Sequence, residues 1–334
     1  MPNMTGSNMT GSNVTDAVND VIVERGLWFR ISDGARRFFD GDVFYSFKRS
    51  PVVMVAFAVT VLFFVLAFLA PWIAPHNTYD VMTLNLMDAF KPPVWEAGGD
   101  PSYLLGTDDQ GRDVFSTIMF GARVSLTVGF LSVILAMVLG IVLGLVAGYF
   151  GGVTDAVIMR IADVQLSFPA ILIVLLIDGF TRSLLPRGMH EEIALVILVL
   201  AIAFANWVQF ARTVRGSCLV EKNKEYVQAA RVIGLHPALI LIRHVLPNVM
   251  SPVLVIATIS LAIAILTEAT LSFLGVGVPP TQPSLGTLIR IGNDFLFSGE
   301  WWMTIFPGAA LVILVLAVNL LGDWLRDALN PKLR

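Results

Sequence analysis

Long runs of apolar residues, separated by polar segments, dominate the chain. Six runs stand out, at residues 52–73, 124–150, 157–177, 193–211, 249–266 and 301–322. A helix needs about 20 mostly apolar residues to cross the ~30 Å hydrocarbon layer of a bilayer, and these runs have roughly that length. The third run is the least regular, because Arg160 and Asp163 lie in its first turns. The pattern therefore predicts an all-α integral membrane protein with six transmembrane helices.

The segments outside these runs differ from one another in character. Residues 1–26 are polar, open on a five-residue repeat, and are predicted to form a disordered tail. Aromatic and basic residues interleave in residues 27–50, which suits an amphipathic segment at the membrane surface. A loop whose aromatic rings pack on neighbouring helices is an equally good interpretation. Residues 51–334 form the membrane domain, with an outer loop at 74–123 and an inner loop at 212–248.

Composition narrows the class of protein further. The chain has 334 residues, of which 56% are hydrophobic and 14% charged, whereas soluble domains average about 45–50% and about 25%. The net charge of −3 argues against nucleic acid as a partner. The single cysteine, Cys218, excludes an internal disulfide framework, and the four histidines lack the spacing of metal ligands. We therefore expect a membrane protein without a metal site of its own.

The basic residues predict the orientation in the membrane. With the N-terminus inside, sixteen of the 22 Lys and Arg residues fall on the inner side and six on the outer side. Inner loops carry the excess of basic residues in membrane proteins. Both termini are therefore expected in the cytoplasm. Within the second run, Gly140, Gly144 and Gly148 are spaced four apart, which permits close contact with another helix.

The inner loop carries the most informative pattern. Residues 225–233 suit a short helix that begins at an acidic residue and ends at Gly234. His236-Pro237 restarts the chain, residues 239–246 are apolar enough to follow the membrane face, and Pro247 is expected to break the helix before the fifth span. Ala229 and Ala230 are expected to leave a shallow patch into which side chains of another protein fit.

Charged residues near the outer side are open to two interpretations. Asp108, Asp109, Arg112 and Asp113 suit either a charge cluster that caps the second span or a metal or substrate site, and we favour the structural interpretation. Glu268, near the outer end of the fifth run, suits a translocation path or an inter-subunit contact, because ionisable groups in spans are often functional. A contact at the helix end is an equally good interpretation.

Enzyme motifs are absent from the sequence. No Gly precedes a Lys, so the chain lacks a Walker A loop, and it has neither a Gly-x-Ser-x-Gly elbow nor a His-Glu-x-x-His pair. We expect no catalytic residues. A transport function would need energy from outside this polypeptide.

A resemblance to a known family then adds to these expectations. In this chain Gln228-Ala-Ala is followed after three residues by Gly234, and after nine more by His244-Val-Leu-Pro247. This resembles the Glu-Ala-Ala, Gly and Ile-x-Leu-Pro loop in permease subunits of ABC importers, with Gln for Glu at 228 and His for Ile at 244. Segments 105–116, 121–126, 271–277, 283–286 and 322–331 resemble the peptide/nickel branch, of the type paired as the second subunit.

The resemblance, which covers roughly residues 46–334, implies a function and partners. It implies an importer permease of the type I fold in the bacterial inner membrane that works by alternating access, and di- or oligopeptides as substrates. It also implies a homologous second permease, two ABC ATPase subunits or domains that hold ATP and Mg²⁺, and an extracytoplasmic binding protein. The ATPase contact would involve Glu225, Gln228, Ala229, Ala230, Gly234, Leu246 and Pro247. Glu225, one turn before Gln228, would supply the charge that Gln228 lacks.

Three alternatives stay open at this point. The same machinery would serve nickel or another small solute. A secondary transporter would work without ATP, although the chain shows neither paired intramembrane carboxylates nor two similar halves. A membrane scaffold that moves nothing would also explain a projecting loop.

Overall fold

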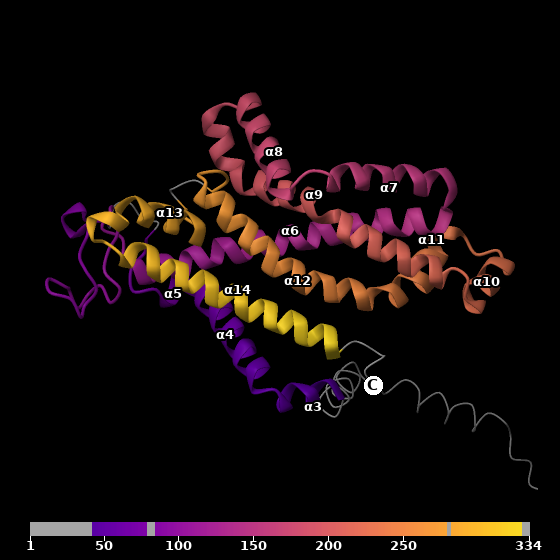
Figure 1. Cartoon of the computed structure of the whole chain (residues 1–334), viewed down its shortest axis with the longest axis horizontal. Coiled ribbons are helices and arrows are strands. Elements are labelled where there is room, and N and C mark those ends of the chain that lie inside the picture. The colour runs from indigo at the N-terminus through magenta and orange to yellow at the C-terminus, as the bar shows by residue number, and fades with distance from the viewer. Residues whose placement is uncertain (1–41, 79–83, 279–281, 329–334) are drawn as a thin grey trace, which may run out of the picture. The chain divides into compact units, whose positions relative to one another are not determined.

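The computed structural model describes residues 42–78, 84–278 and 282–328, which fall into two units. Within the first unit, residues 1–51, the described part is mainly helix α3, Asp42–Arg49, which ends on Lys48 and Arg49. The predicted tail at 1–26 and most of the amphipathic segment at 27–50 lie outside the described residues. The second unit holds the membrane domain (Figure 1).

Helices make up almost all of the described part of the second unit. Their bounds are α4 Pro51–Phe68, α5 Ala70–Ile73, α6 Val114–Phe150, α7 Gly152–Leu166, α8 Ala170–Leu184, α9 Arg187–Glu221, α10 Glu225–Val232, α11 Pro237–Ile240, α12 Leu246–Phe273, α13 Leu285–Phe295 and α14 Trp302–Ala328. Short 3₁₀ turns occupy Leu86–Asp88 and Leu296–Ser298. A single isolated bridge pairs Thr107 with Asp113 in the described residues. The all-α expectation is confirmed.

Five helical stretches of the described chain are each long and apolar enough to cross a membrane. They are Pro51–Phe68, Val114–Phe150, Ile193–Glu221, Pro237–Phe273 and Trp302–Ala328. The predicted first, second, fourth, fifth and sixth runs fall on these stretches. Only three residues of α4 are buried in the unit, so most of this apolar helix faces outward, as lipid contact requires.

The third predicted span is not one straight helix. Helices α7 and α8 meet at an angle of 91°, and the chain between them passes through Ser167, Phe168 and Pro169. Proline restricts the residue before it to extended conformations and lacks the N–H of a continuous helix. Hydropathy alone gives no sign of this break in the helix. The pair makes a sixth span only if the two helices count as one bent crossing.

Glycines bring α6 and α9 into close contact. A Cβ atom added at Gly140 would lie 2.4 Å from the Cβ of Phe210, and one at Gly144 would lie 2.6 Å from the carbonyl oxygen of Ala211. At Gly148 the corresponding distance to the Cβ of Cys218 is 2.8 Å. The predicted close helix contact is therefore confirmed, and it is made within this chain.

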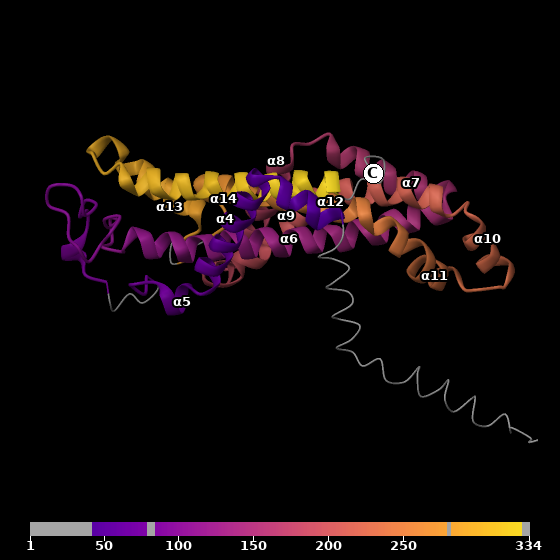
Figure 2. The same ribbon diagram turned by 90° about the horizontal axis from the view of Figure 1, so that it is seen from below.

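The long loops lie at opposite ends of the helix bundle. Both views place α10 and α11 at one end, and α13 with the loop before α6 at the other (Figures 1 and 2). Helix α6 begins at Val114, so the outer loop ends at Asp113. The helix thus starts ten residues before the apolar run at residue 124, and its 37 residues exceed the length that a ~30 Å hydrocarbon layer requires.

Candidate coupling loop and outer cap

The inner loop folds as the sequence predicts for its first half. Helix α10 begins at Glu225 and ends at Val232, and Gly234 has a φ of +82°, the left-handed conformation that glycine adopts most readily. His236 then caps α11, because its Nδ1 accepts a hydrogen bond of 3.3 Å from the N–H of Ala238. Pro237 occupies the first turn of α11, where its missing N–H costs nothing.

The predicted break at Pro247 was wrong. Leu241–Val245 forms a π-helical turn, and α12 continues from Leu246 through Pro247 to Phe273. Proline removes one backbone donor from a helix, and a π turn shifts the hydrogen-bonding register so that the helix continues. Helices α11 and α12 consequently form one stretch, Pro237–Phe273, that joins the loop to the fifth span.

One side of the loop packs into the bundle. Val227 and Val245 are fully buried, and Ala230 is 4% exposed. All three belong to the main apolar cluster of the unit, which also contains residues of α6, α9 and α12. A displacement of α10 therefore has to be accommodated by the spans.

Polar contacts join the loop to the spans as well. Tyr226 donates its hydroxyl to Glu221 at the end of α9 and accepts a hydrogen bond of 3.2 Å from Nδ2 of Asn248 in α12. The guanidinium of Arg231 lies 4.8 Å from the ring centre of Tyr149 in α6. Burial and the neighbouring Glu221 carboxylate raise the pKa of Tyr226 to about 12, so its hydroxyl stays a donor at neutral pH.

The opposite side of the loop is open to solvent. Glu225, Gln228 and Ala229 are exposed, and Val232 and Ile233 are 88% and 76% exposed. A Cβ atom on Gly234 would meet no atom within 4 Å. Gln228 bonds within the loop, donating to the carbonyl oxygen of Asn223 at 3.0 Å. We call the face formed by Glu225, Gln228, Ala229, Val232, Ile233 and Gly234 the coupling face.

The structure divides the residues expected in the ATPase contact. Ala229 is exposed, but Ala230 points into the core, since neighbouring helical residues are about 100° apart. The expected patch of two alanines is therefore wrong. Leu246 is half-buried and Pro247 is exposed. Both lie at the start of α12, outside the coupling face. The sequence analysis did not include Val232 and Ile233 in the expected contact. The signal that could have identified them is their apolar character at positions other than the buried Val227 and Ala230.

Ion pairs brace the spans next to this loop. Arg215 of α9 donates two hydrogen bonds, of 2.5 and 2.6 Å, to the carboxylate of Asp155 in α7. Arg212 lies 2.5 Å from Asp163, also in α7. Gln165 bridges the same helices, donating to the carbonyl of Phe204 at 2.6 Å and accepting from the indole of Trp207 at 2.7 Å. These polar residues hold α7 against α9.

At the other end, the outer charge cluster caps α6. Asp108 accepts hydrogen bonds from the backbone N–H and from Nε of Arg112, at 2.8 and 2.6 Å. Asp113 is the N-cap residue of α6 and accepts from the N–H of Ser116 at 2.9 Å. All three charged side chains are buried. These contacts are the structural arrangement that the sequence analysis favoured.

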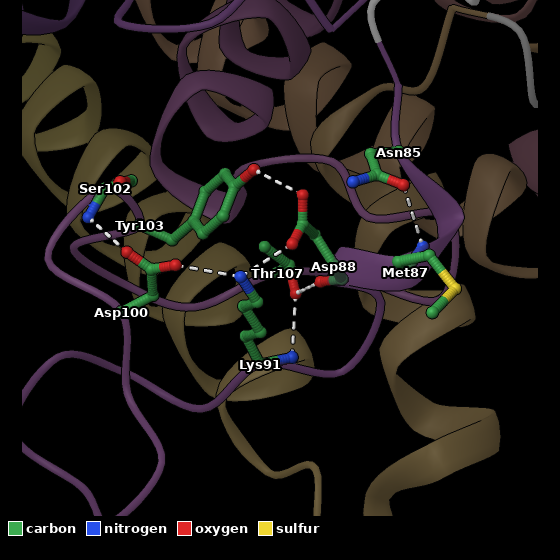
Figure 3. Close-up of polar contacts among 8 residues, drawn as sticks. All are labelled: Asn85, Met87, Asp88, Lys91, Asp100, Ser102, Tyr103 and Thr107. Carbon is green, nitrogen blue, oxygen red and sulfur yellow. Dashed lines mark hydrogen bonds and ion pairs between the residues drawn. The ribbon is translucent and has the colours of Figure 1, made fainter.

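A second polar network fixes the loop beside this cap (Figure 3). Nζ of Lys91 lies 2.6 Å from Asp88 and 2.8 Å from Asp100, and Thr107 donates to the carbonyl oxygen of Asp88 at 2.6 Å. Lys91 lowers the pKa of Asp88, and Lys91 with Ser102 lowers that of Asp100 to about 2. The two carboxylates in turn raise the pKa of Lys91.

Glu268 lies inside the bundle. Its side chain is fully buried, and Oε1 accepts a hydrogen bond of 2.7 Å from Ser272. Helix α13 packs closely next to it, since a Cβ on Gly286 would lie 2.1 Å from the carbonyl oxygen of Ala269. The side chain therefore lines neither a path nor a subunit surface in this structure, contrary to that part of the expectation.

Comparison with known proteins places this architecture in a family. Residues 140–334 match the family described as "Binding-protein-dependent transport system inner membrane component". Residues 39–93 match the "N-terminal TM domain of oligopeptide transport permease C". The chain belongs to the DppC/OppC family of peptide ABC importer permeases.

Individual relatives match over most of their length. The dipeptide transport system permease protein DppC of Escherichia coli (strain K12) is 40% identical over 88% of this chain and 93% of its own. DppC of Haemophilus influenzae is 38% identical over 88% and 95%. The oligopeptide transport system permease protein OppC of Bacillus subtilis (strain 168) is 37% identical over 88% and 90%.

Family membership settles several expectations. The chain is a multi-pass inner-membrane permease subunit of a dipeptide or oligopeptide importer. It works in a binding-protein-dependent ABC system, so its partners include an ATPase and a binding protein. ATP hydrolysis takes place on those separate ATPase subunits, and this chain is not the enzyme. An ATP-independent secondary transporter and an inert scaffold are excluded.

Proposed function

We propose that an ATPase subunit binds this permease at the coupling face. The observation that carries the proposal is the two-sidedness of the loop: Val227 and Ala230 are buried in the bundle, whereas Val232 and Ile233 of the same segment are exposed. Apolar side chains held in solvent by a rigid helix gain stability when a partner covers them. The buried side of α10 then transmits the partner's movement to α6, α9 and α12.

In this proposal the chain pairs with a homologous second permease. Two ATPase subunits or domains bind ATP and Mg²⁺ on the cytoplasmic side of this pair. ATP binding closes the ATPases, the movement reaches the coupling face, and the spans rock so that the path opens outward. Glu225 supplies the charge of the loop in place of Gln228. Its carboxylate is exposed and makes no ion pair with a described residue, so it is available to a basic group of the partner.

Two variants of Gly234 test the proposal in the assembled importer. Gly234→Trp and Gly234→Ala share the strain of a φ of +82°, about 1 kcal/mol for a residue with a Cβ. Only the indole adds bulk on the coupling face. We expect Gly234→Trp to reduce binding-protein-stimulated ATP hydrolysis and peptide uptake at least tenfold, and Gly234→Ala to keep most of both. Equal activity of the two variants would contradict the proposal.

A further inference from the structure

A groove runs along the surface of the bundle between α6 and α9. Its volume is about 790 Å³, within the range of ~300–1,000 Å³ typical of small-ligand sites. It is lined by α6 between Arg123 and Val138, by Leu195, Val196 and Val199 of α9, and by Gln282. From Arg123 to Val138 the groove follows α6 for roughly 22 Å at ~1.5 Å per residue.

The chemistry of the groove changes along its length. Arg123, Thr127 and Gln282 gather at the end nearest the outer loop, and the rest of the lining is apolar. Arg123 is the last charged residue before the uncharged run 124–150. Its side chain is exposed, and no carboxylate of the described chain pairs with it. The outer mouth of the groove therefore presents an unpaired guanidinium.

We propose that this groove is one wall of the peptide path, and that Arg123 binds the C-terminal carboxylate of the peptide as it enters. The inference rests on the family's peptide-import function and adds a residue to it. Every peptide with a free C-terminus carries this carboxylate, and a guanidinium binds it through two parallel hydrogen bonds. Side chains vary from peptide to peptide, and an apolar wall accepts them without directional bonds.

Cysteine chemistry tests the proposal in the complete importer, reconstituted in liposomes with the binding protein outside and ATP inside. The native thiol of Cys218 is fully buried, so Arg123→Cys introduces a single reactive site in this chain. The variant is treated with a trimethylammonium-ethyl or a sulfonatoethyl methanethiosulfonate. Ser183→Cys, exposed at the end of α8, is the matched control.

The expected result is a charge-dependent rescue. Hydrogen bonds between charged groups are among the strongest polar contacts in proteins, so Arg123→Cys should lower dipeptide uptake about tenfold or more. The cationic reagent should restore much of the rate and the anionic reagent none of it. Transported dipeptide should slow modification of the new thiol, and neither reagent should alter uptake by Ser183→Cys.

Other outcomes overturn the inference without touching the family's function, which uptake by the unmodified importer measures separately. Unchanged uptake in Arg123→Cys, or equal rescue by both reagents, contradicts carboxylate binding. Modification at a rate that peptide does not change shows that the peptide does not cover this position. Loss of the second permease from the purified Arg123→Cys complex, retained in Arg123→Lys, shows that the arginine holds the two permeases together instead.

Discussion

Tyr226 shows how a single side chain fastens the inner loop to the helix bundle. Its hydroxyl contacts Glu221 at the end of α9 and Asn248 in α12, so it joins the two helices that enter and leave the loop. The ring also stacks on His244, with centroids 6.5 Å apart. The sequence motif does not include Tyr226, and its role emerges only from the folded arrangement.

Removal of this hydroxyl should loosen α10. We expect Tyr226→Phe to destabilise the loop by about 1 kcal/mol, because a partly solvent-exposed hydrogen bond is lost while the ring remains. Amide hydrogen exchange of residues 225–232 measures the effect and should become severalfold faster. Tyr45→Phe, at a side chain that is 69% exposed, is the control. Unchanged exchange in Tyr226→Phe would show that the hydroxyl does not hold the loop.

The stabilising effect of the polar network around Lys91 is expected to depend on pH. The pKa values of Asp88 and Asp100 are lowered in the folded protein, so their stabilising effect is complete above their unfolded pKa of ~3.9 and is lost as pH falls through the folded values. The raised pKa of Lys91 acts in the opposite direction: its effect is complete below ~10.4 and is lost at higher pH.

The variant Lys91→Met removes the cation and tests this directly. We expect the wild type to have the higher melting temperature at pH 6, and the difference to shrink as pH falls from about 4 towards the Asp100 pKa of about 2. Melting temperatures in detergent between pH 3 and pH 7 provide the measurement. A difference that stays constant over this range would contradict the proposed carboxylate contacts.

At the scale of elements, the α6–α9 contact is the clearest case of sequence determining packing. Gly140, Gly144 and Gly148 permit backbone approach, and the structure fills that space with Phe210, Ala211 and Cys218. The four-residue spacing predicted a close helix contact, but not its partner. Only the fold decides that α9 of the same chain, and not another subunit, occupies the stripe.

A pair of glycine substitutions tests this contact. Gly144→Ala would place a Cβ 2.6 Å from the carbonyl oxygen of Ala211, whereas Gly216→Ala on α9 would meet no atom within 4 Å. Overpacking costs about 1–3 kcal/mol, and alanine in an open helix position gains up to ~1 kcal/mol over glycine. SDS titration in mixed micelles should therefore show Gly144→Ala less stable than the wild type and Gly216→Ala no less stable.

The failures of sequence reasoning at this scale have physical causes. The third run was taken as one span because its apolar residues continue past Pro169, and hydropathy does not register a missing backbone donor. Pro247 was expected to mark a break in the helix, yet the π-helical turn at Leu241–Val245 lets the helix continue through it. The two errors concern the same residue type, whose effect depends on the turn before it.

At the scale of the whole molecule, the all-α class and the places of five spans could be predicted from the sequence, since each span must satisfy its own backbone in lipid. The buried side of the coupling loop and the outer network of Lys91, Asp88 and Asp100 could not. These contacts join residues far apart in the chain or within irregular loops, where no periodicity signals them. The coupling motif was recognisable, but only the structure separates its exposed residues from its buried ones.

The proposed mechanism requires that the coupling face is the point of contact with the ATPase. Photo-crosslinking in the assembled importer tests this most directly, with the crosslinker placed at Val232 or, as control, at Met87; these side chains are 88% and 87% exposed. We expect the crosslinker at Val232 to capture an ATPase subunit, and the crosslinker at Met87, in the predicted outer loop, to capture none. Capture of the ATPase at Met87, or its absence at Val232, would contradict the account.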